Sequence, residues 1–236
     1  MPTRALSGAA GKLLPAVFSA ASICSALLLA APAASLAAAP VATDVVTPSV
    51  QPADNEAVRN EINVMRSNPP AYAAKLRAYR AFIGPDKIWR HPSRPVGVIT
   101  HEGTAAVDEA IAVLEAASPL PPLADDPRLA AAALAHAVEQ SRTGAIGHDS
   151  ADGTTMGARI KRGLEFYGSL AETISYGQNT PEDVVRQLLV DDNVPSRGHR
   201  KILLLAEMHF VGVGCATHPV YRFSCVQDYS SIALPK

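Results

Sequence analysis

The sequence predicts an α+β domain, most simply a small antiparallel sheet covered by helices. Two helix start signals, Asp126-Pro127 and Thr180-Pro181, each place a capping side chain directly before a proline. Residues 170–176 (LAETISY) alternate as a strand does, so that every second side chain lies on one face. Residues 210–215 and 221–226 also have strand character, and the short turn between them predicts an antiparallel hairpin.

Helices are predicted where apolar residues recur three and four positions apart. In the first of these segments, residues 56–66, the side chains of Val58, Ile62 and Met65 share one face. Residues 84–99 are rich in proline and glycine, and we expect them to form a loop. Further helices are expected at residues 71–83, at 101–117 with Thr100 as N-cap, and at 127–142, 154–164, 181–190 and 197–205.

The first 39 residues are typical of a secretory signal peptide. Arg4 and Lys12 are their only charged residues, Leu13–Ala30 is an apolar run, and Ser35-Leu36-Ala37 offers a cleavage site. A retained membrane anchor is the alternative, because the apolar run is long enough to span a bilayer. Its proline, its serines and the alanine-rich end favour cleavage, so we expect an exported protein, either secreted or periplasmic.

The remainder of the chain is expected to form a linker followed by one domain. Residues 40–54 are rich in proline, threonine and valine without helical spacing, which indicates a linker. Residues 55–232 then form the domain. Nothing after residue 39 is apolar for long enough to cross a bilayer, so we expect no transmembrane segment in the mature chain.

Export determines which cysteines the mature protein keeps and in which compartment they lie. Cys24 would leave with the signal peptide, and Cys215 and Cys225 would remain in an oxidising compartment. They lie in the two arms of the predicted hairpin, which favours a disulfide between them. A pair of buried free thiols is the alternative.

Composition excludes several functional classes. The net charge is -1, and the chain has one tryptophan, six tyrosines and five phenylalanines. Neither a basic field nor an aromatic platform for nucleic acid is expected from these numbers. The sequence also lacks G-x-S-x-G, H-E-x-x-H, a P-loop and a glycine-rich dinucleotide turn, which argues against the common hydrolase and nucleotide-binding classes.

Polar residues that could carry chemistry lie near the strand at 170–176. Glu172 shares a face with apolar residues, so its carboxylate is expected to be partly desolvated and to need a partner. A shifted strand boundary would instead turn Glu172 toward water. His148, His199 and either Asp191 or Asp192 are candidate partners for a metal site or an acid–base pair, although their spacing matches no local metal-binding motif.

Four segments of the sequence resemble the SCP/CAP superfamily of cysteine-rich secretory proteins, antigen 5 and pathogenesis-related proteins, and its bacterial exported branch in particular. The resemblance covers nearly all of the domain and implies an α-β-α sandwich with a small antiparallel sheet between helical layers. The segments are residues 119–123 (PLPPL), 147–150 (GHDS), 171–177 (AETISYG) and 190–200 (VDDNVPSRGHR).

The resemblance also implies a cavity with two histidines and two acidic residues. His148, Glu172 and His199 match three of these positions, and Asp191 matches the fourth, with Asp192 as a competing assignment. Some family members bind a divalent metal there, so His148 and His199 are the expected ligands for an ion such as zinc. Thr173 replaces the usual asparagine beside the glutamate.

Three functions are compatible with these features. The first is a non-enzymatic extracellular module that binds a lipid or a cell-envelope component. The alternative is a divalent-metal-assisted hydrolase, in which zinc on His148 and His199 would act with Glu172 on a water molecule. A purely structural envelope protein is a third possibility, in which the four side chains only order the core.

Overall fold

A four-stranded sheet forms the centre of the domain in the computed structural model, which describes residues 51–162, 164–166 and 168–235. The predicted signal peptide, residues 1–39, and most of the predicted linker lie outside the described residues. The strand order is β3-β5-β6-β4, and all neighbours are antiparallel except β3 and β5. The strands are β3 (Ala124–Asp125), β4 (Leu170–Tyr176), β5 (Phe210–His218) and β6 (Arg222–Ser230).

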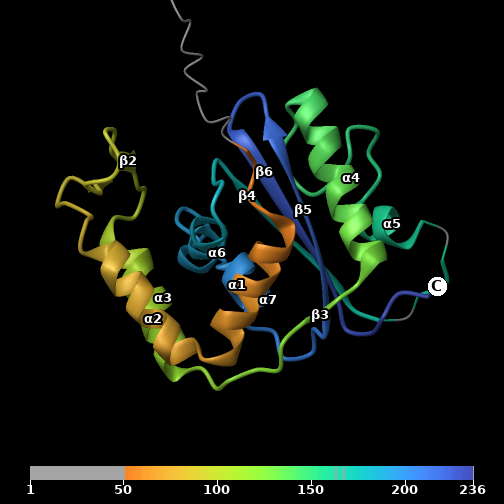
Figure 1. The fold of residues 1–236 in the computed structure, drawn as a ribbon, viewed down its shortest axis with the longest axis horizontal. Helices are drawn as coiled ribbons and strands as arrows, with labels where there is room; N and C mark the ends of the chain where they lie inside the picture. The colour runs from red at the N-terminus through yellow and green to blue at the C-terminus, as the bar shows by residue number, and fades with distance from the viewer. Residues whose placement is uncertain (1–50, 163, 167, 236) are drawn as a thin grey trace, which may run out of the picture. The chain divides into compact units, whose positions relative to one another are not determined.

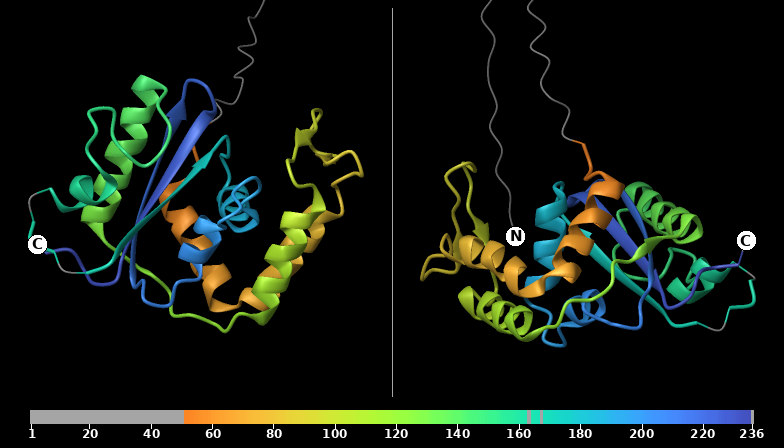
Figure 2. Two further views of the ribbon diagram at one scale, coloured as in Figure 1. Left: turned by 180° about the vertical axis from the view of Figure 1, so that it is seen from behind. Right: turned by 60° about the horizontal axis from the view of Figure 1, so that its bottom comes forward.

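Helices cover both faces of this sheet, as the α-β-α prediction requires (Figures 1 and 2). Helices α4 (Pro127–Thr143) and α5 (Met156–Lys161) pack on one face. The other face contacts α1, α6 and α7, and the pair α2 and α3 continues the same apolar cluster. These helices are α1 (Asn55–Ser67), α2 (Pro69–Arg80), α3 (Thr104–Ala116), α6 (Pro181–Val190) and α7 (Gly198–Leu203).

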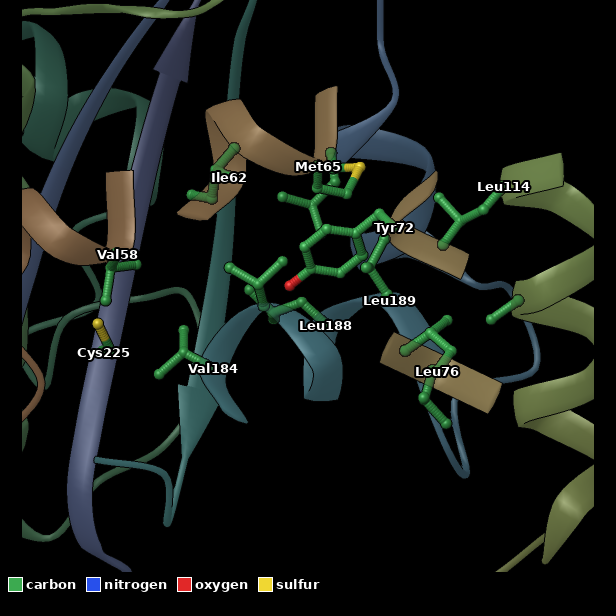
Figure 3. Packing of buried hydrophobic residues seen from close by; sticks show 14 of the residues in the cluster. Val58, Ile62, Met65, Tyr72, Leu76, Leu114, Val184, Leu188, Leu189 and Cys225 are labelled. Carbon is green, nitrogen blue, oxygen red and sulfur yellow. The ribbon is translucent and has the colours of Figure 1, made fainter. Parts of the chain in front are cut away.

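The largest core lies between α1, α2, α3, α6 and the sheet (Figure 3). The predicted face of α1 is buried there, since Val58, Ile62 and Met65 are fully covered. Leu188 of α6 and Tyr72 of α2 pack into the same cluster. Burying each large apolar side chain contributes about 1.5–3 kcal/mol, so this cluster is the main source of the domain's stability.

Helix α4 approaches the sheet far more closely than the helices on the other face. A β-carbon placed on Gly212 would lie 1.9 Å from the backbone nitrogen of Ala130, and one on Gly214 would lie 2.2 Å from that of Leu134. Since no side chain fits these distances, the two glycines let the helix rest on the strand backbone. The small buried side chain of Ala133 on the helix serves the same close packing.

Most predicted elements are confirmed, and the cap signals explain why. Asp126 accepts hydrogen bonds from the backbone nitrogens of Arg128 and Leu129, and the Thr180 hydroxyl accepts one from the Asp183 nitrogen. These side chains satisfy N–H groups that have no partner inside their own helices. Both helices therefore begin at the proline that follows the cap.

Five features differ from the prediction. Residues 84–99 are not a plain loop but contain a small hairpin, β1 (Ile88–Trp89) and β2 (Val98–Ile99). Helix α3 starts at Thr104 after Gly103, because the Thr100 hydroxyl donates to the Lys87 carbonyl instead of capping the helix. The other differences are shorter helices than predicted at 71–83 and 154–164, and the short strand β3, which the sequence did not indicate.

Cys215 and Cys225 form the predicted disulfide. They are directly opposite each other in the β5–β6 ladder, with 4.0 Å between their Cα atoms. In the part of the chain that the structure describes, no helix is long and apolar enough to span a bilayer.

Replacing both cysteines, Cys215→Ala with Cys225→Ala, is expected to lower the free energy of unfolding by about 2–3 kcal/mol, because the bond closes a short loop in the unfolded chain. Urea unfolding of the oxidised wild type and the variant measures the difference. Reduction should bring the wild type to the value of the variant. Two titratable thiols in denatured, unreduced protein would contradict the bond.

Candidate functional site

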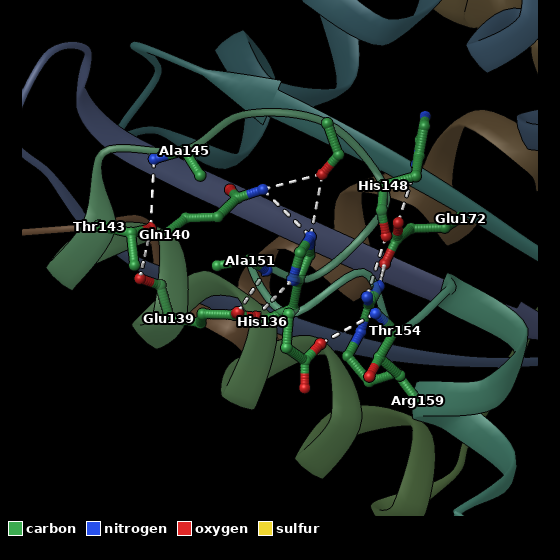
Figure 4. A network of polar contacts seen from close by, with 12 residues as sticks. His136, Glu139, Gln140, Thr143, Ala145, His148, Ala151, Thr154, Arg159 and Glu172 are labelled. Carbon is green, nitrogen blue, oxygen red and sulfur yellow. Dashed lines mark hydrogen bonds and ion pairs between the residues drawn. The ribbon is translucent and has the colours of Figure 1, made fainter.

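Strand β4 places Glu172 inside the domain. Its side chain is fully buried and points toward the layer of α4 and α5, where His148 and Arg159 contact it (Figure 4). The neighbouring residue Thr173 points to the other face and donates its hydroxyl to Gln227. The register of β4 therefore turns the carboxylate away from water, and the alternative of a solvent-facing Glu172 is wrong.

A tightly held loop after α4 brings His148 to this carboxylate. His136 and Gln140 of α4 both hydrogen-bond the Gly147 carbonyl oxygen, each at 2.9 Å. The Gly147 nitrogen donates to the Tyr176 hydroxyl at the end of β4. The loop is thus fixed from the helix and from the strand, and His148 Nδ1 lies 2.8 Å from Glu172 Oε1.

Arg159 is the second partner of Glu172, and sequence reasoning did not identify it. It lies on α5, is 5% exposed, and donates through its guanidinium to Glu172 Oε2 and to the His148 carbonyl oxygen. A buried carboxylate requires such a cation. The available signal was a basic residue in the helix that directly follows the His148 loop.

The second histidine is held by Asp191, at the C-terminal end of α6. His199 Nδ1 lies 2.6 Å from Asp191 Oδ1, and the His199 backbone nitrogen donates to Asp191 Oδ2 at 2.9 Å. Asp192 instead accepts hydrogen bonds from the backbone nitrogens of His101 and Glu102. Of the two candidate aspartates, Asp191 is therefore the one beside His199.

The two carboxylate–histidine pairs, Glu172 with His148 and Asp191 with His199, lie close together although the two histidines come from opposite layers of the sandwich. The ring centroids of His148 and His199 are 6.5 Å apart. Glu172 and Asp191 are buried, whereas the side chains of His148 and His199 are 51% and 23% exposed. The buried carboxylates therefore orient two imidazoles that solvent can reach.

This geometry does not fit a metal ion held by all four side chains. Glu172 already contacts His148 and Arg159 with its two oxygens, and Asp191 contacts the ring and backbone of His199. Across the described ranges, no three His, Cys, Asp or Glu side chains are arranged to hold a metal. The Nε2 atoms of His148 and His199 are the atoms that remain as possible metal ligands. Two ligands are fewer than the three or four that tetrahedral zinc sites generally take from the protein.

The charges around Glu172 shift three pKa values. Hydrogen bonding to Glu172 raises the pKa of His148 above its ordinary value, against the effect of burial. Burial acts to raise the pKa of Glu172, but its hydrogen bond from His148 and the charge of Arg159 bring it below the ordinary value. Asp228 lies directly opposite Glu172 on β6, and its burial, together with the Glu172 charge, raises its pKa well above the usual range.

A cavity of about 410 Å³ lies beside one of the two pairs. His199 and Asp191 line it, together with Tyr176 of β4 and with Val98 and Ile99 of the β1–β2 hairpin. His148 and Glu172 do not line it. Its lining combines apolar side chains such as Val98 and Ile99 with polar ones such as Asp191 and His199, which suits an amphipathic small molecule.

Asp228→Asn is expected to stabilise the protein at pH 7 by at least about 1 kcal/mol. Burial raises the pKa of native Asp228 well above its usual range, whereas unfolded Asp228 ionises above about pH 4. The native state therefore loses stability as pH rises above that value, and asparagine removes this loss. Urea unfolding at pH 7 and pH 4 should show the advantage shrinking at pH 4. Exposed Asp149→Asn is the control, and an equal effect at both pH values would contradict a raised pKa of Asp228.

His148→Ala is expected to cost more stability at pH 5.5 than at pH 8.5. A histidine with a raised native pKa stabilises fully below its unfolded pKa of about 6.5, and this contribution is lost as pH rises through the native pKa. Denaturation at the two pH values measures the difference. In Glu172→Gln the NMR titration of His148 should move back toward the ordinary value; an unchanged titration would contradict the pairing.

Comparison with solved structures finds matches to bacterial proteins. An extracellular protein containing an SCP domain from Bacillus anthracis str. Ames is 30% identical over 47% of this chain and 34% of its own, with a TM-score of 0.38. An outer surface protein from Borrelia burgdorferi is 21% identical over 49% of this chain and 80% of its own, with a TM-score of 0.40. A cysteine-rich secretory protein from Staphylococcus aureus subsp. aureus Mu50 is 18% identical over 48% and 33%, with a TM-score of 0.37.

The chain therefore spans about a third of the Bacillus and Staphylococcus proteins. No curated protein matches the chain. A family model described as the cysteine-rich secretory protein family, CAP, matches residues 59–229. Because this match covers most of the chain, including both carboxylate–histidine pairs, the protein belongs to the cysteine-rich secretory protein (CAP) family.

Proposed function

We propose that this protein is an exported CAP-domain module that binds a small lipid or cell-envelope component in the cavity beside His199. The cavity is the observation that carries the proposal: its volume of about 410 Å³ is in the range of small-molecule sites. Export rests on the charge and apolar pattern of residues 1–39. The disulfide Cys215–Cys225 agrees with an oxidising compartment.

The state of Glu172 favours binding over hydrolysis. A carboxylate that activates water must reach that water. The Glu172 side chain is fully buried, and its oxygens are engaged by His148 and Arg159. Its role in this proposal is to orient His148, as Asp191 orients His199.

A divalent-metal-assisted hydrolase remains the second candidate, because each histidine uses Nδ1 for a carboxylate and thereby presents Nε2. Carboxylate–imidazole pairs of this kind orient metal-binding histidines in many proteins. His148 and His199 would hold the ion, and the ion would supply Lewis-acid chemistry. Glu172 and Asp191 would set the tautomers of the two rings.

The binding proposal predicts that Val98→Trp removes a ligand that co-purifies with the wild type. Val98 lines the cavity and is 42% exposed, so a larger side chain narrows the cavity without disturbing the core. Mass spectrometry of solvent extracts, on protein from the exported fraction, should show at least a several-fold loss. Intact-mass measurement of the same protein should give a mature N-terminus between Ala33 and Pro40.

Val64→Trp, on the exposed face of α1 and outside the cavity, is the matched control and should keep the ligand. A fluorescent long-chain fatty acid provides a second readout in stripped protein. An empty wild-type extract together with no saturable binding of this probe would overturn the proposal. Equal ligand content in Val98→Trp and Val64→Trp would show that the ligand binds outside this cavity.

Zinc is expected to bind weakly and through the histidines. Calorimetric titration should show at least a ten-fold loss of affinity in His148→Ala and in His199→Ala, and no loss in His209→Ala, an exposed histidine outside the site. Because zinc must displace a proton from His148, whose pKa is raised, affinity should already fall as pH drops toward about 6.5. Equal binding by all four proteins would exclude a metal site here, whereas tight binding with zinc-dependent turnover would favour the hydrolase.

A further inference from the structure

Three connections at one end of the domain expose large apolar side chains. They are the β1–β2 hairpin, the loop after α4 and the turn between β5 and β6, and we refer to their exposed residues as the apolar tips. Exposed fractions reach 74% for Val96 and Ile99, 69% for Val220 and 59% for Ile146. The full set is Val96, Val98, Ile99, Ile146, Val220 and Tyr221.

Direct contacts join two of the three connections, and the cavity lies between them and the hairpin. His218 Nε2 lies 3.1 Å from the Ala145 carbonyl oxygen, which ties the β5–β6 turn to the loop after α4. The Tyr221 ring packs 5.3 Å from the Tyr176 ring, and Tyr176 lines the cavity together with Val98 and Ile99. In Figure 1 the hairpin, this turn and the end of α4 all lie at the top. Two of the apolar tips, Val98 and Ile99, thus line the cavity, and Tyr221 packs against Tyr176 in its wall.

This arrangement is unlike the ordinary scatter of exposed apolar residues on a soluble protein. A single exposed valine requires no explanation, but clusters rimmed by polar groups mark interaction surfaces. Within the described part of the chain, six of the eleven exposed large apolar side chains belong to the apolar tips. They come from three separate connections, so no single packing constraint places them together.

Basic residues accompany the apolar tips. The hairpin region carries Lys87, Arg90 and Arg94, and the other two connections are flanked by Arg142 and Arg222. Arg90 pairs with Asp86 and Arg94 with Asp183. Over the ranges that the structure describes, Arg142 and Arg222 form no salt bridge.

The combination of apolar tips and unpaired cations fits one kind of partner. Arg142 and Arg222 are both exposed, so each can meet an anionic partner beside the apolar tips. An anionic bilayer accepts apolar side chains at the depth of its headgroups and attracts arginine and lysine to its surface.

We propose that this end of the domain docks on a bilayer of anionic phospholipid. The apolar tips enter the headgroup region, Arg142 and Arg222 contact lipid phosphates, and the cavity faces the membrane between them. This proposal goes beyond ligand binding in the cavity, because the docking contacts do not require an occupied cavity. Docking would hold the domain where a membrane component could enter the cavity.

Vesicle co-sedimentation tests the proposal on protein recovered from the exported fraction. We expect binding to vesicles of phosphatidylglycerol and phosphatidylcholine, at least ten-fold weaker binding to phosphatidylcholine alone, and weakening by added salt. The double substitution Val96→Asp with Val220→Asp should lower the partition coefficient at least ten-fold. Neither residue lines the cavity, so ligand content is expected to stay unchanged.

Val64→Asp with Val113→Asp is the matched control, because these exposed valines lie on α1 and α3, outside the apolar tips. It introduces the same charge and should leave vesicle binding unchanged; thermal melts confirm that both variants are folded. Absence of wild-type binding, or equal binding by the two double variants, would overturn the proposal. So would a dimer in sedimentation analysis that only the Val96/Val220 variant dissociates, since the partner would then be a second copy of the chain.

Discussion

The direct contact between helix α4 and the backbone of strand β5 determines how one half of the candidate site is built. Gly212 and Gly214 leave no room for a β-carbon, so the helix lies at the closest possible distance from the strand. At this distance the end of the helix, at Gly144, meets Pro219 in the β5–β6 turn, and the loop that follows leads His148 to Glu172. Two glycines far from the site in sequence thus set its geometry.

The other requirement of the site is that a buried negative charge keeps its partners. Removing a carboxylate from water is costly unless cations or hydrogen-bond donors replace the solvent. Arg159 and His148 do so for Glu172, and the raised pKa of Asp228 on the neighbouring strand disfavours a second buried charge there. His148 is therefore the solvent-accessible end of a polar network, and the fold fixes the buried part of that network, Glu172 and Arg159.

Sequence reasoning predicted what depends on neighbouring residues and missed what depends on tertiary contact. The caps Asp126 and Thr180 act within their own helices, so those starts could be predicted. The β1–β2 hairpin has two residues in each strand, too few for a visible alternation. Arg159 gained its role only because α5 packs over β4, and residue spacing alone could not bring His148 to Glu172; that expectation came from the family resemblance.

Strand β4 is an outer strand of the sheet, and a side chain of α6 covers one end of its free edge. The side-chain amide of Gln187, on α6, accepts a hydrogen bond from the Tyr176 nitrogen and donates one to the Tyr176 oxygen. It occupies the backbone groups of Tyr176, so strand addition is blocked at this end of the edge. The same glutamine lines the cavity, so the residue that protects this end of the edge also shapes the cavity wall.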